Sequence, residues 1–305
     1  MTTLPYPKTL VLGGSGFIGS RLKELYVDLA QNLLFVSSND VDILDFESLQ
    51  NFIRQSGIDV VLNLAAYTDV KGSLAEIGNK DGLAWKLNVE GTSNVAKVCR
   101  QGGLYLSYIS TDNVFYGGNG PFDEYDKLVN DGTVDWYGFT KRKAEEVVEK
   151  YCDKFSIVRI AYPFGSRDMN KDYVLKLIEG IKKDRPLFND QKFSPTYISV
   201  LGDALKNIIS NKLVGKFHVA CREITTPFEI GTFLAKQIKI DNEVKPGSIL
   251  DYEKLIGKKS PYNPNGGLKV KKTEELLDME FPTWKEAVTD YISNNFKDSK
   301  PLESA

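Results

Sequence analysis

A tyrosine and a lysine four residues apart, Tyr137 and Lys141, have the types and spacing needed for acid–base chemistry. Residues with this spacing lie on one face of a helix, one turn apart. An ammonium group beside a phenol favours the phenolate, so we expect Lys141 to lower the pKa of Tyr137 and to make it a usable proton donor or acceptor near neutral pH. The pair alone is a weak signal, because such pairs occur by chance on the surfaces of many helices.

Two features that precede this pair give it a context. Thr111 follows the apolar run 105–110, where its hydroxyl could orient a carbonyl oxygen. Gly13, Gly16 and Gly19 follow another apolar run and open a stretch with helical spacing. Such a loop lets the backbone approach a pyrophosphate, and the helix N-terminus supplies amide donors. A nucleotide loop, a strand-end hydroxyl and a Tyr-x-x-x-Lys pair, in that order, predict an enzyme that transfers a hydride to or from a carbonyl.

The bulk composition indicates a globular protein without a basic field for nucleic acid or anionic membranes. The 305 residues carry a net charge of −2, and 42% are hydrophobic. Three separated cysteines and a single histidine, His218, do not predict a disulfide framework or a zinc site, and we expect no metal. The first residues lack a signal-peptide pattern, and no apolar run approaches the ~20 residues that span a bilayer. We therefore expect a reduced, cytoplasmic protein.

Alternating strands and helices in the first half of the chain predict a doubly wound parallel α/β sheet, the Rossmann architecture. We expect an NAD(P)-binding Rossmann domain at 1–165. A smaller, mainly substrate-binding α/β lobe is expected at 166–296, with a possible strand return to the main sheet, and a polar tail at 297–305. The expected strands are 9–12, 33–36, 59–64, 105–110, 155–160 and 215–220, and the expected helices are 17–29, 46–55, 83–101, 137–150, 172–183, 203–210, 227–238 and 284–294.

The choice between NADH and NADPH depends on the end of the second strand. An acid at that point would bind the ribose 2′-hydroxyl of NAD. The expected strand ends in Ser37-Ser38-Asn39, and Asp40 comes late. Arg21 could reach a 2′-phosphate, although a solvated helix residue is the plainer interpretation. The sequence leaves both cofactors open, with a slight lean to NADPH.

Several polar or small residues have a structural interpretation beside the functional one. The small residues in 63–67 let a cofactor lie across the strand ends, or simply pack tightly. Asn88 is predicted in mid-helix, where its amide hydrogen-bonds either into the site or to the backbone. Asp112 either touches the substrate or caps the local turn. Ser110 competes with Thr111 for the catalytic role, but strand alternation points the two in opposite directions.

Several short motifs together have the pattern of a known family. They are Ala65-Ala-Tyr-Thr68, Ser110-Thr-Asp-Asn-Val-Phe115, Tyr137-Gly-Phe-Thr-Lys141, Asp190-Gln-Lys-Phe-Ser-Pro-Thr196 and Phe217-His-Val-Ala220. With these motifs the chain resembles the extended short-chain dehydrogenases, and more narrowly the dTDP-4-dehydrorhamnose reductase family, from about residue 10 to residue 291. Its glycine spacing, G-x-x-G-x-x-G, is typical of the wider group. The Ser-Thr-Asp-x-Val-Phe and Asp-Gln…Pro-Thr patterns favour the reductase branch over sugar epimerases.

The resemblance implies NAD(P)H-dependent reduction of the 4-keto group of a nucleotide-linked 6-deoxyhexose. Tyr137 would be the proton donor, Lys141 its electrostatic partner, and Thr111 the group that orients the carbonyl. Asp112 and Tyr162 would face the sugar together with Thr111. The residues expected around the cofactor, beside Tyr137 and Lys141, are Gly13, Ser15, Gly16, Phe17, Ile18, Gly19, Asp42, Ile43, Ala65, Ala66, Tyr67 and Asn88.

Three departures from the family pattern fall where the nucleotide-sugar should bind. The stretch 70–76 replaces an acidic one, Phe193 replaces a glycine, and Ser260-Pro261 stands in place of Arg-Pro. Phe193 also brings the chain nearer the regulatory subunits of methionine adenosyltransferase. Two alternatives therefore stay open: a non-catalytic NADP-binding regulatory subunit, and a bifunctional nucleotide-sugar epimerase/reductase.

The expected partners are a nucleotide-linked sugar and a second copy of the chain. In the expected homodimer, the helices at 83–101 and 137–150 form a two-fold four-helix contact. No nucleic acid or membrane partner is expected.

Overall fold

A six-stranded parallel sheet forms the centre of the molecule, which a computed structural model describes at residues 6–166 and 171–295. The strand order is β2-β1-β3-β4-β5-β7. The inner strands are almost continuously apolar, as strands covered on both faces must be. The strands are β1 (Thr9–Leu12), β2 (Leu33–Val36), β3 (Val60–Asn63), β4 (Tyr105–Thr111), β5 (Phe155–Ile160) and β7 (Gly215–His218).

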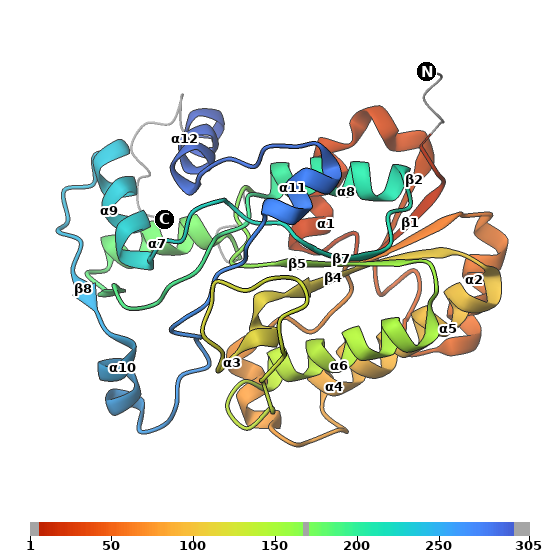
Figure 1. Ribbon diagram of the computed structural model, residues 1–305, viewed down its shortest axis with the longest axis horizontal. Coiled ribbons are helices and arrows are strands. Elements are labelled where there is room, and N and C mark those ends of the chain that lie inside the picture. Colours follow the sequence, from red (N-terminus) through yellow and green to blue (C-terminus); the bar gives the residue numbers. More distant parts are fainter. Residues whose placement is uncertain (1–5, 167–170, 296–305) are drawn as a thin grey trace.

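Helices cover both faces of this sheet, which confirms the doubly wound fold predicted from the sequence (Figure 1). In one layer, α8 packs against both α1 and α11, and in the other layer α5 packs between α2 and α6. The first layer consists of α1 (Phe17–Leu25), α8 (Ile198–Ser210) and α11 (Lys271–Leu277). The second consists of α2 (Phe46–Ser56), α4 (Leu83–Trp85), α5 (Thr92–Gly102) and α6 (Trp136–Tyr151).

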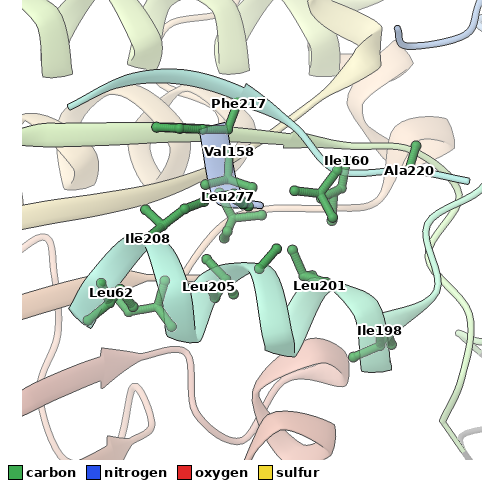
Figure 2. Packing of buried hydrophobic residues seen from close by; sticks show 14 of the residues in the cluster. Leu62, Val158, Ile160, Ile198, Leu201, Leu205, Ile208, Phe217, Ala220 and Leu277 are labelled. Carbon is green, nitrogen blue, oxygen red and sulfur yellow. The ribbon is translucent and has the colours of Figure 1, made fainter. Parts of the chain in front are cut away.

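The core between α8 and the sheet shows how this layer is held. Leu201, Leu205 and Ile208 project from one side of α8, at the three- and four-residue spacing of a helix face. They pack towards Val158 of β5 and Phe217 of β7 (Figure 2). These five side chains are at most 2% exposed, so this apolar contact fixes α8 on the sheet.

A smaller group of elements lies beyond the end of the sheet. It has its own apolar cluster, to which Phe164, Ile178 and Trp284 belong. Part-way through this half of the chain, after α8 and before α9, the chain returns to the main sheet as β7, which pairs in parallel with β5. The elements of this lobe are α7 (Tyr173–Lys182), the paired strands β6 (Leu187–Phe188) and β8 (Pro246–Gly247), α9 (Pro227–Gln237), α10 (Ile249–Ile256) and α12 (Trp284–Asn295).

One expected helix, 83–101, is interrupted by a π-helical turn. The turn spans Lys86–Gly91 and lies between α4 and α5. A π-helical turn inserts one residue per turn and frequently occurs at a functional site. Asn88 lies in this turn and is fully buried.

Other boundaries differ from the expected ones by a few residues. The helix expected at 17–29 ends at Leu25, because the chain tightens into a 3₁₀ helix at Val27–Asn32. Helix α8 begins at Ile198, five residues before the expected start, and β7 ends at His218. The short elements β6, β8, α10 and α11 were not expected, and the expected tail 297–305 lies outside the described residues. None of the described helices combines the length and hydrophobicity needed to cross a membrane.

Candidate active site

The predicted site residues gather at one edge of the sheet. Because the strands are parallel and in register, Leu12 lies beside Asn63, and Thr111 lies beside Ile160. The chain leaves β1 towards β2 on one side and then returns to β3 on the other side. Ligands of open α/β sheets bind at the carboxyl ends of the strands where the direction of winding reverses in this way.

The glycine loop after β1 has the geometry of a phosphate cradle. Gly13 has a φ of 76°, and a Cβ there would lie 2.8 Å from the backbone nitrogen of Ala65. A Cβ on Gly19 would lie 2.5 Å from the carbonyl oxygen of Gly13. Gly16 is the N-cap residue of α1 and has no side chain to cap it, so the amides of the first helical turn stay available to an anion. These positions fit a dinucleotide pyrophosphate.

The segment after β3 is fixed by two asparagines. Asn63 Oδ1 accepts a hydrogen bond from the Ala65 amide at 3.1 Å. Asn88 Oδ1 accepts one from the Tyr67 amide at 2.8 Å, and its Nδ2 donates to Thr140 Oγ1 at 2.8 Å. Of the two roles left open for Asn88, the structure shows the contact with the backbone. Asn88 thus ties the expected cofactor-facing segment to α6.

Two acidic residues follow β2, and both bind backbone amides of their own turns. Asp40 Oδ2 accepts hydrogen bonds from the amide and the hydroxyl of Ser37, each at 2.7 Å. These bonds, that of the amide first, lower the pKa of Asp40. Asp42 Oδ1 accepts one from the Leu44 amide at 2.9 Å. The adjacent Ile43 is buried, and it packs so closely that a Cβ on Gly91 would lie 2.5 Å from its Cδ1.

Helix α6 carries Tyr137 and Lys141, and Asp135 caps its N-terminus by accepting a hydrogen bond from the Gly138 amide at 3.0 Å. Lys141 is 3% exposed. Its Nζ donates to the Ile109 carbonyl oxygen at 2.7 Å. Burial lowers the pKa of Lys141 to about 7, and the negative charge of Glu145 acts in the opposite direction. Lys141 therefore titrates near neutral pH.

The structure corrects the expectation that Lys141 lowers the pKa of Tyr137. Burial raises the pKa of this phenol, the charges of Asp135 and Asp112 raise it further, and a hydrogen bond with the Thr111 side chain acts the other way. The ammonium of Lys141 is instead engaged with β4. Tyr137 is consequently protonated at neutral pH, which is the state that a proton donor needs.

Thr111 is the last residue of β4 and meets Tyr137 across the strand end. Its Oγ1 donates to Asp112 Oδ1 at 3.3 Å and accepts from the Asn113 amide at 3.3 Å. Burial raises the pKa of Asp112 to about 7, against the effect of the Thr111 hydrogen bond. The hydroxyls of Thr111 and Tyr137 therefore lie beside a carboxyl group that titrates near neutral pH.

Tyr162 stands near these groups and is supported from behind by aromatic rings. Its φ of 43° lies in the left-handed region, where a tyrosine is strained. Its hydroxyl accepts a hydrogen bond from Gln191 Nε2 at 2.5 Å. Its ring lies 4.4 Å from that of Phe193 and 4.9 Å from that of Tyr173. Burial and then the charge of Asp112 raise the pKa of Tyr162, so that carboxyl group acts electrostatically on the Tyr162 phenol.

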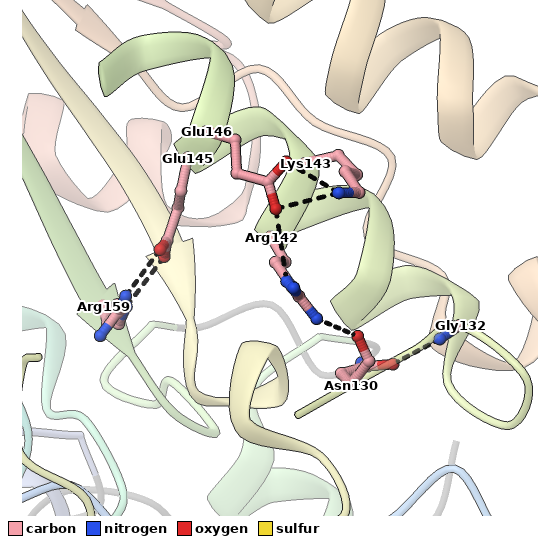
Figure 3. A network of polar contacts seen from close by, with 7 residues as sticks. All are labelled: Asn130, Gly132, Arg142, Lys143, Glu145, Glu146 and Arg159. Atoms are coloured by element: carbon pink, nitrogen blue, oxygen red, sulfur yellow. Dashed lines mark hydrogen bonds and ion pairs between the residues drawn. The ribbon is translucent and has the colours of Figure 1, made fainter. Parts of the chain in front are cut away.

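Sequence reasoning missed four residues that surround this site: Asp135, Glu145, Arg159 and Gln191. A signal existed for Arg159, because it is the one charged residue in the apolar run of β5. Its partner Glu145 lies on α6 (Figure 3). Among the described residues, no group of three or more histidine, cysteine, aspartate or glutamate side chains is placed to hold a metal ion.

Relatives of the chain are found along almost its whole length. The family model described as RmlD substrate binding domain matches residues 7–296. The chain belongs to this family. A dTDP-4-dehydrorhamnose reductase of Streptomyces griseus is 33% identical over 219 residues, which are 70% of this chain and 69% of that protein. A dTDP-4-dehydrorhamnose reductase of Escherichia coli (strain K12) is 24% identical over 303 residues, which are 94% and 97% of the two chains.

Solved structures of reductases share the fold of this RmlD-family chain. A dTDP-4-dehydrorhamnose reductase from Bacillus anthracis, in complex with NADP, matches with a TM-score of 0.83 at 24% identity, over 95% of this chain and 99% of that one. One from Clostridium acetobutylicum matches with a TM-score of 0.81 at 25% identity, over 94% and 98%. The predicted family and fold class are thereby confirmed.

The buried lysine predicts how the stability of this RmlD-family protein changes with pH. Between the folded pKa of about 7 and the ordinary value of 10.5, unfolded Lys141 binds a proton that folded Lys141 does not. Raising the pH from 7 to 9 should therefore stabilise the native chain, by about 2 kcal/mol relative to a Lys141→Met variant. Urea unfolding of both cofactor-free proteins at the two pH values measures this difference. The same pH dependence in both proteins would contradict the prediction.

Proposed function

We propose that the protein reduces the 4-keto group of a nucleotide-linked 6-deoxyhexose with NAD(P)H. The observation that carries the proposal is the meeting of Thr111, Tyr137 and Lys141 at the carboxyl edge of a sheet that also presents a phosphate cradle. Membership of the RmlD family and the names of its relatives support this chemistry. In those relatives the named substrate is dTDP-4-dehydrorhamnose, and we propose the same substrate class here.

In the proposed mechanism, bound NAD(P)H supplies a hydride to C4 of the sugar. The Thr111 hydroxyl donates a hydrogen bond to the keto oxygen and orients it. Tyr137, protonated at neutral pH, gives its proton to that oxygen as negative charge develops there. Lys141, one turn further along α6, supplies positive charge for the tyrosinate that results, although in the structure its ammonium is held by the Ile109 carbonyl oxygen. Asp112 and Tyr162 contact the sugar beside the reacting carbon.

The proposed cofactor site extends along the strand ends. The backbone from Gly13 to Gly19 holds the pyrophosphate, and the segment Ala65–Tyr67, fixed by Asn88, lines the path to Tyr137. Asp40 bends back onto Ser37 and has its charge partly satisfied there. That engagement supports the lean to NADPH, which needs no free acid at this position. The Bacillus anthracis relative was solved with NADP.

Replacing Tyr137 with phenylalanine should remove the proton donor and leave the fold intact. General acid–base groups contribute about 10²–10⁴-fold, so the turnover number should fall by that factor, while cofactor affinity should change little because the ring remains. Lys141→Ala should impair both turnover and cofactor affinity. Turnover is measured by oxidation of NADPH and NADH against a panel of nucleotide-linked 4-keto sugars. Near-normal turnover by the Tyr137→Phe protein would refute the mechanism.

The same panel separates the alternatives. Binding of NADPH by the wild-type chain without turnover of any sugar, together with altered kinetics of a partner enzyme, would support a regulatory subunit. A product with an inverted carbon beside the reduced one would support a bifunctional epimerase/reductase.

A bulky residue at Gly16 should abolish cofactor binding, because it blocks approach of the pyrophosphate to the backbone. Gly16 has a φ of −73°, and a Cβ there would meet only the Gly13 carbonyl oxygen, at 3.1 Å, so Gly16→Val should fold. Gly180→Ala, on α7, is the control. A Cβ there would lie at an ordinary contact distance of 3.6 Å from Leu187, and residue 180 is far from the cradle in sequence. Calorimetry with NADPH and NADH measures both proteins. Undiminished binding by folded Gly16→Val protein would reject the proposed cradle.

We further propose that two copies associate through the layer formed by α4, α5 and α6. These helices pack against one another on one side of the sheet, and Leu83 at the start of α4 is 55% exposed (Figure 1). An isologous pair is the commonest closed assembly. Light scattering at micromolar concentration should give twice the 34.2 kDa mass of the chain, and Leu83→Asp should shift the protein towards monomer. A monomeric wild-type protein would reject this proposal.

A further inference from the structure

A positively charged side chain, that of Arg159, is buried against the sheet near the edge that carries the proposed active site. Arg159 is the fifth residue of β5, and its side chain is fully buried. A buried guanidinium loses its hydration, which is costly unless its nitrogens find partners. Each of the three nitrogens of Arg159 has a partner, and the groups around the guanidinium come from four different segments.

Glu145 of α6 provides the main partner and binds Arg159 through both oxygens. Arg159 Nε donates to Oε1 at 2.9 Å, and Nη2 donates to Oε2 at 2.6 Å (Figure 3). Nη1 donates to the Glu124 carbonyl oxygen at 2.8 Å. The guanidinium also lies 4.7 Å from the ring centre of Phe115. Two parallel charged hydrogen bonds fix both distance and orientation, which a single contact does not.

His218 of β7 completes the set of partners. Its Nε2 lies 3.3 Å from Arg159 Nη1, and its Nδ1 lies 3.1 Å from the Lys269 carbonyl oxygen. Burial, and then the charge of Arg159, lower the pKa of His218 to about 3. The ring is therefore neutral near pH 7: Nδ1 donates to the carbonyl, and Nε2 accepts from the guanidinium.

The Glu145–Arg159 pair lies next to the proposed catalytic residues both on α6 and on the sheet. Glu145 lies one helical turn beyond Lys141 and two beyond Tyr137, so all three share a face of α6. Arg159 lies opposite Ser110 in the β4–β5 pairing, one position before Thr111 and its neighbour. The two parallel hydrogen bonds between Glu145 and Arg159, called the fork below, thus join α6, which carries the proton donor, to β5, which lies beside the carbonyl-orienting residue.

We propose that Glu145 and Arg159 are positioning residues of the reductase site: their buried fork fixes α6 along the sheet and so sets Tyr137 and Lys141 relative to Thr111. The proposal rests on the proposed reductase function. The proposal gives no such role to the exposed ion pair that lies one residue further along α6, where Glu146 binds Lys143 at 2.8 Å. An exposed pair contributes little.

The fork also acts on the charge of Lys141. The groups that face its ammonium are the Tyr108 ring of β4 at 4.1 Å, the Ile109 carbonyl, and Glu145 on its own helix. Glu145 is the anion among them, and its charge opposes the effect of burial on the pKa of Lys141. Removing that charge, with the side-chain shape kept, should move the titration of Lys141 to lower pH.

The test compares Glu145→Gln with the matched control Glu146→Gln. In Glu145→Gln, NMR of protein labelled with ¹³C at lysine Cε should show Lys141, assigned with Lys141→Met, titrating about one pH unit lower than in the wild type. In the sugar assay, kcat should fall about tenfold or more with little change in KM, and the loss should grow with rising pH. Glu146→Gln should match the wild type in both measurements.

The NMR titration needs no sugar substrate, so it tests the fork even if the proposed reductase function fails. An unchanged titration of Lys141 in Glu145→Gln would overturn the electrostatic part of the proposal. Because Glu145→Gln leaves a buried cation unpaired and could unfold, the double variant Glu145→Gln/Arg159→Met supplies a second route, since removing both charges is far less costly than removing one. If the folded double variant had wild-type kcat and a wild-type pH profile, the pair would be merely structural and the positioning role would be refuted.

Discussion

The attachment of α6 to the sheet is the interaction on which the arrangement of the site depends. Lys141 uses its ammonium to hold the Ile109 carbonyl of β4, and Glu145 holds Arg159 of β5 through two charged hydrogen bonds. Asn88 fastens Thr140 to the segment after β3, and Asp135 fixes the first turn of the helix. Each contact replaces lost hydration with an ordered polar partner, so the helix cannot slide without leaving buried polar groups unpaired.

The motifs of the sequence predicted which residues could do the chemistry, but they predicted the contacts of those residues less well. Tyr137, Lys141 and Thr111 were recognisable because a helical spacing and a strand end can be identified locally. The group that Lys141 contacts was not recognisable, because its partner is a backbone carbonyl 32 residues away in the chain. The π-helical turn around Asn88 escaped notice for a related reason. The apolar spacing of this stretch resembles that of an ordinary helix, and only the backbone of the folded chain reveals the π-helical turn.

The departures from the family pattern also become physically understandable in the structure. Phe193 is 1% exposed, and its ring supports Tyr162 from behind. The stretch 70–76 forms a short helix, Val70–Ser73, capped by Asp69, and one 3₁₀ turn. Ser260 is buried, and its carbonyl accepts a hydrogen bond from the Tyr116 hydroxyl at 2.8 Å. The roles of Phe193 and Ser260 do not follow from residue type alone, because each depends on a neighbour distant in sequence.

The return of β7 to the sheet binds the two halves of the chain into one folding unit. β7 pairs along β5, and α8, which also comes from the second half, covers the apolar face of the same strands. A fragment that stopped after β5 would expose an unpaired strand edge and a broad apolar surface, both of which promote aggregation. The first half of the chain is therefore not a portable module. A functional chimera of two relatives has to inherit both halves of this sheet together.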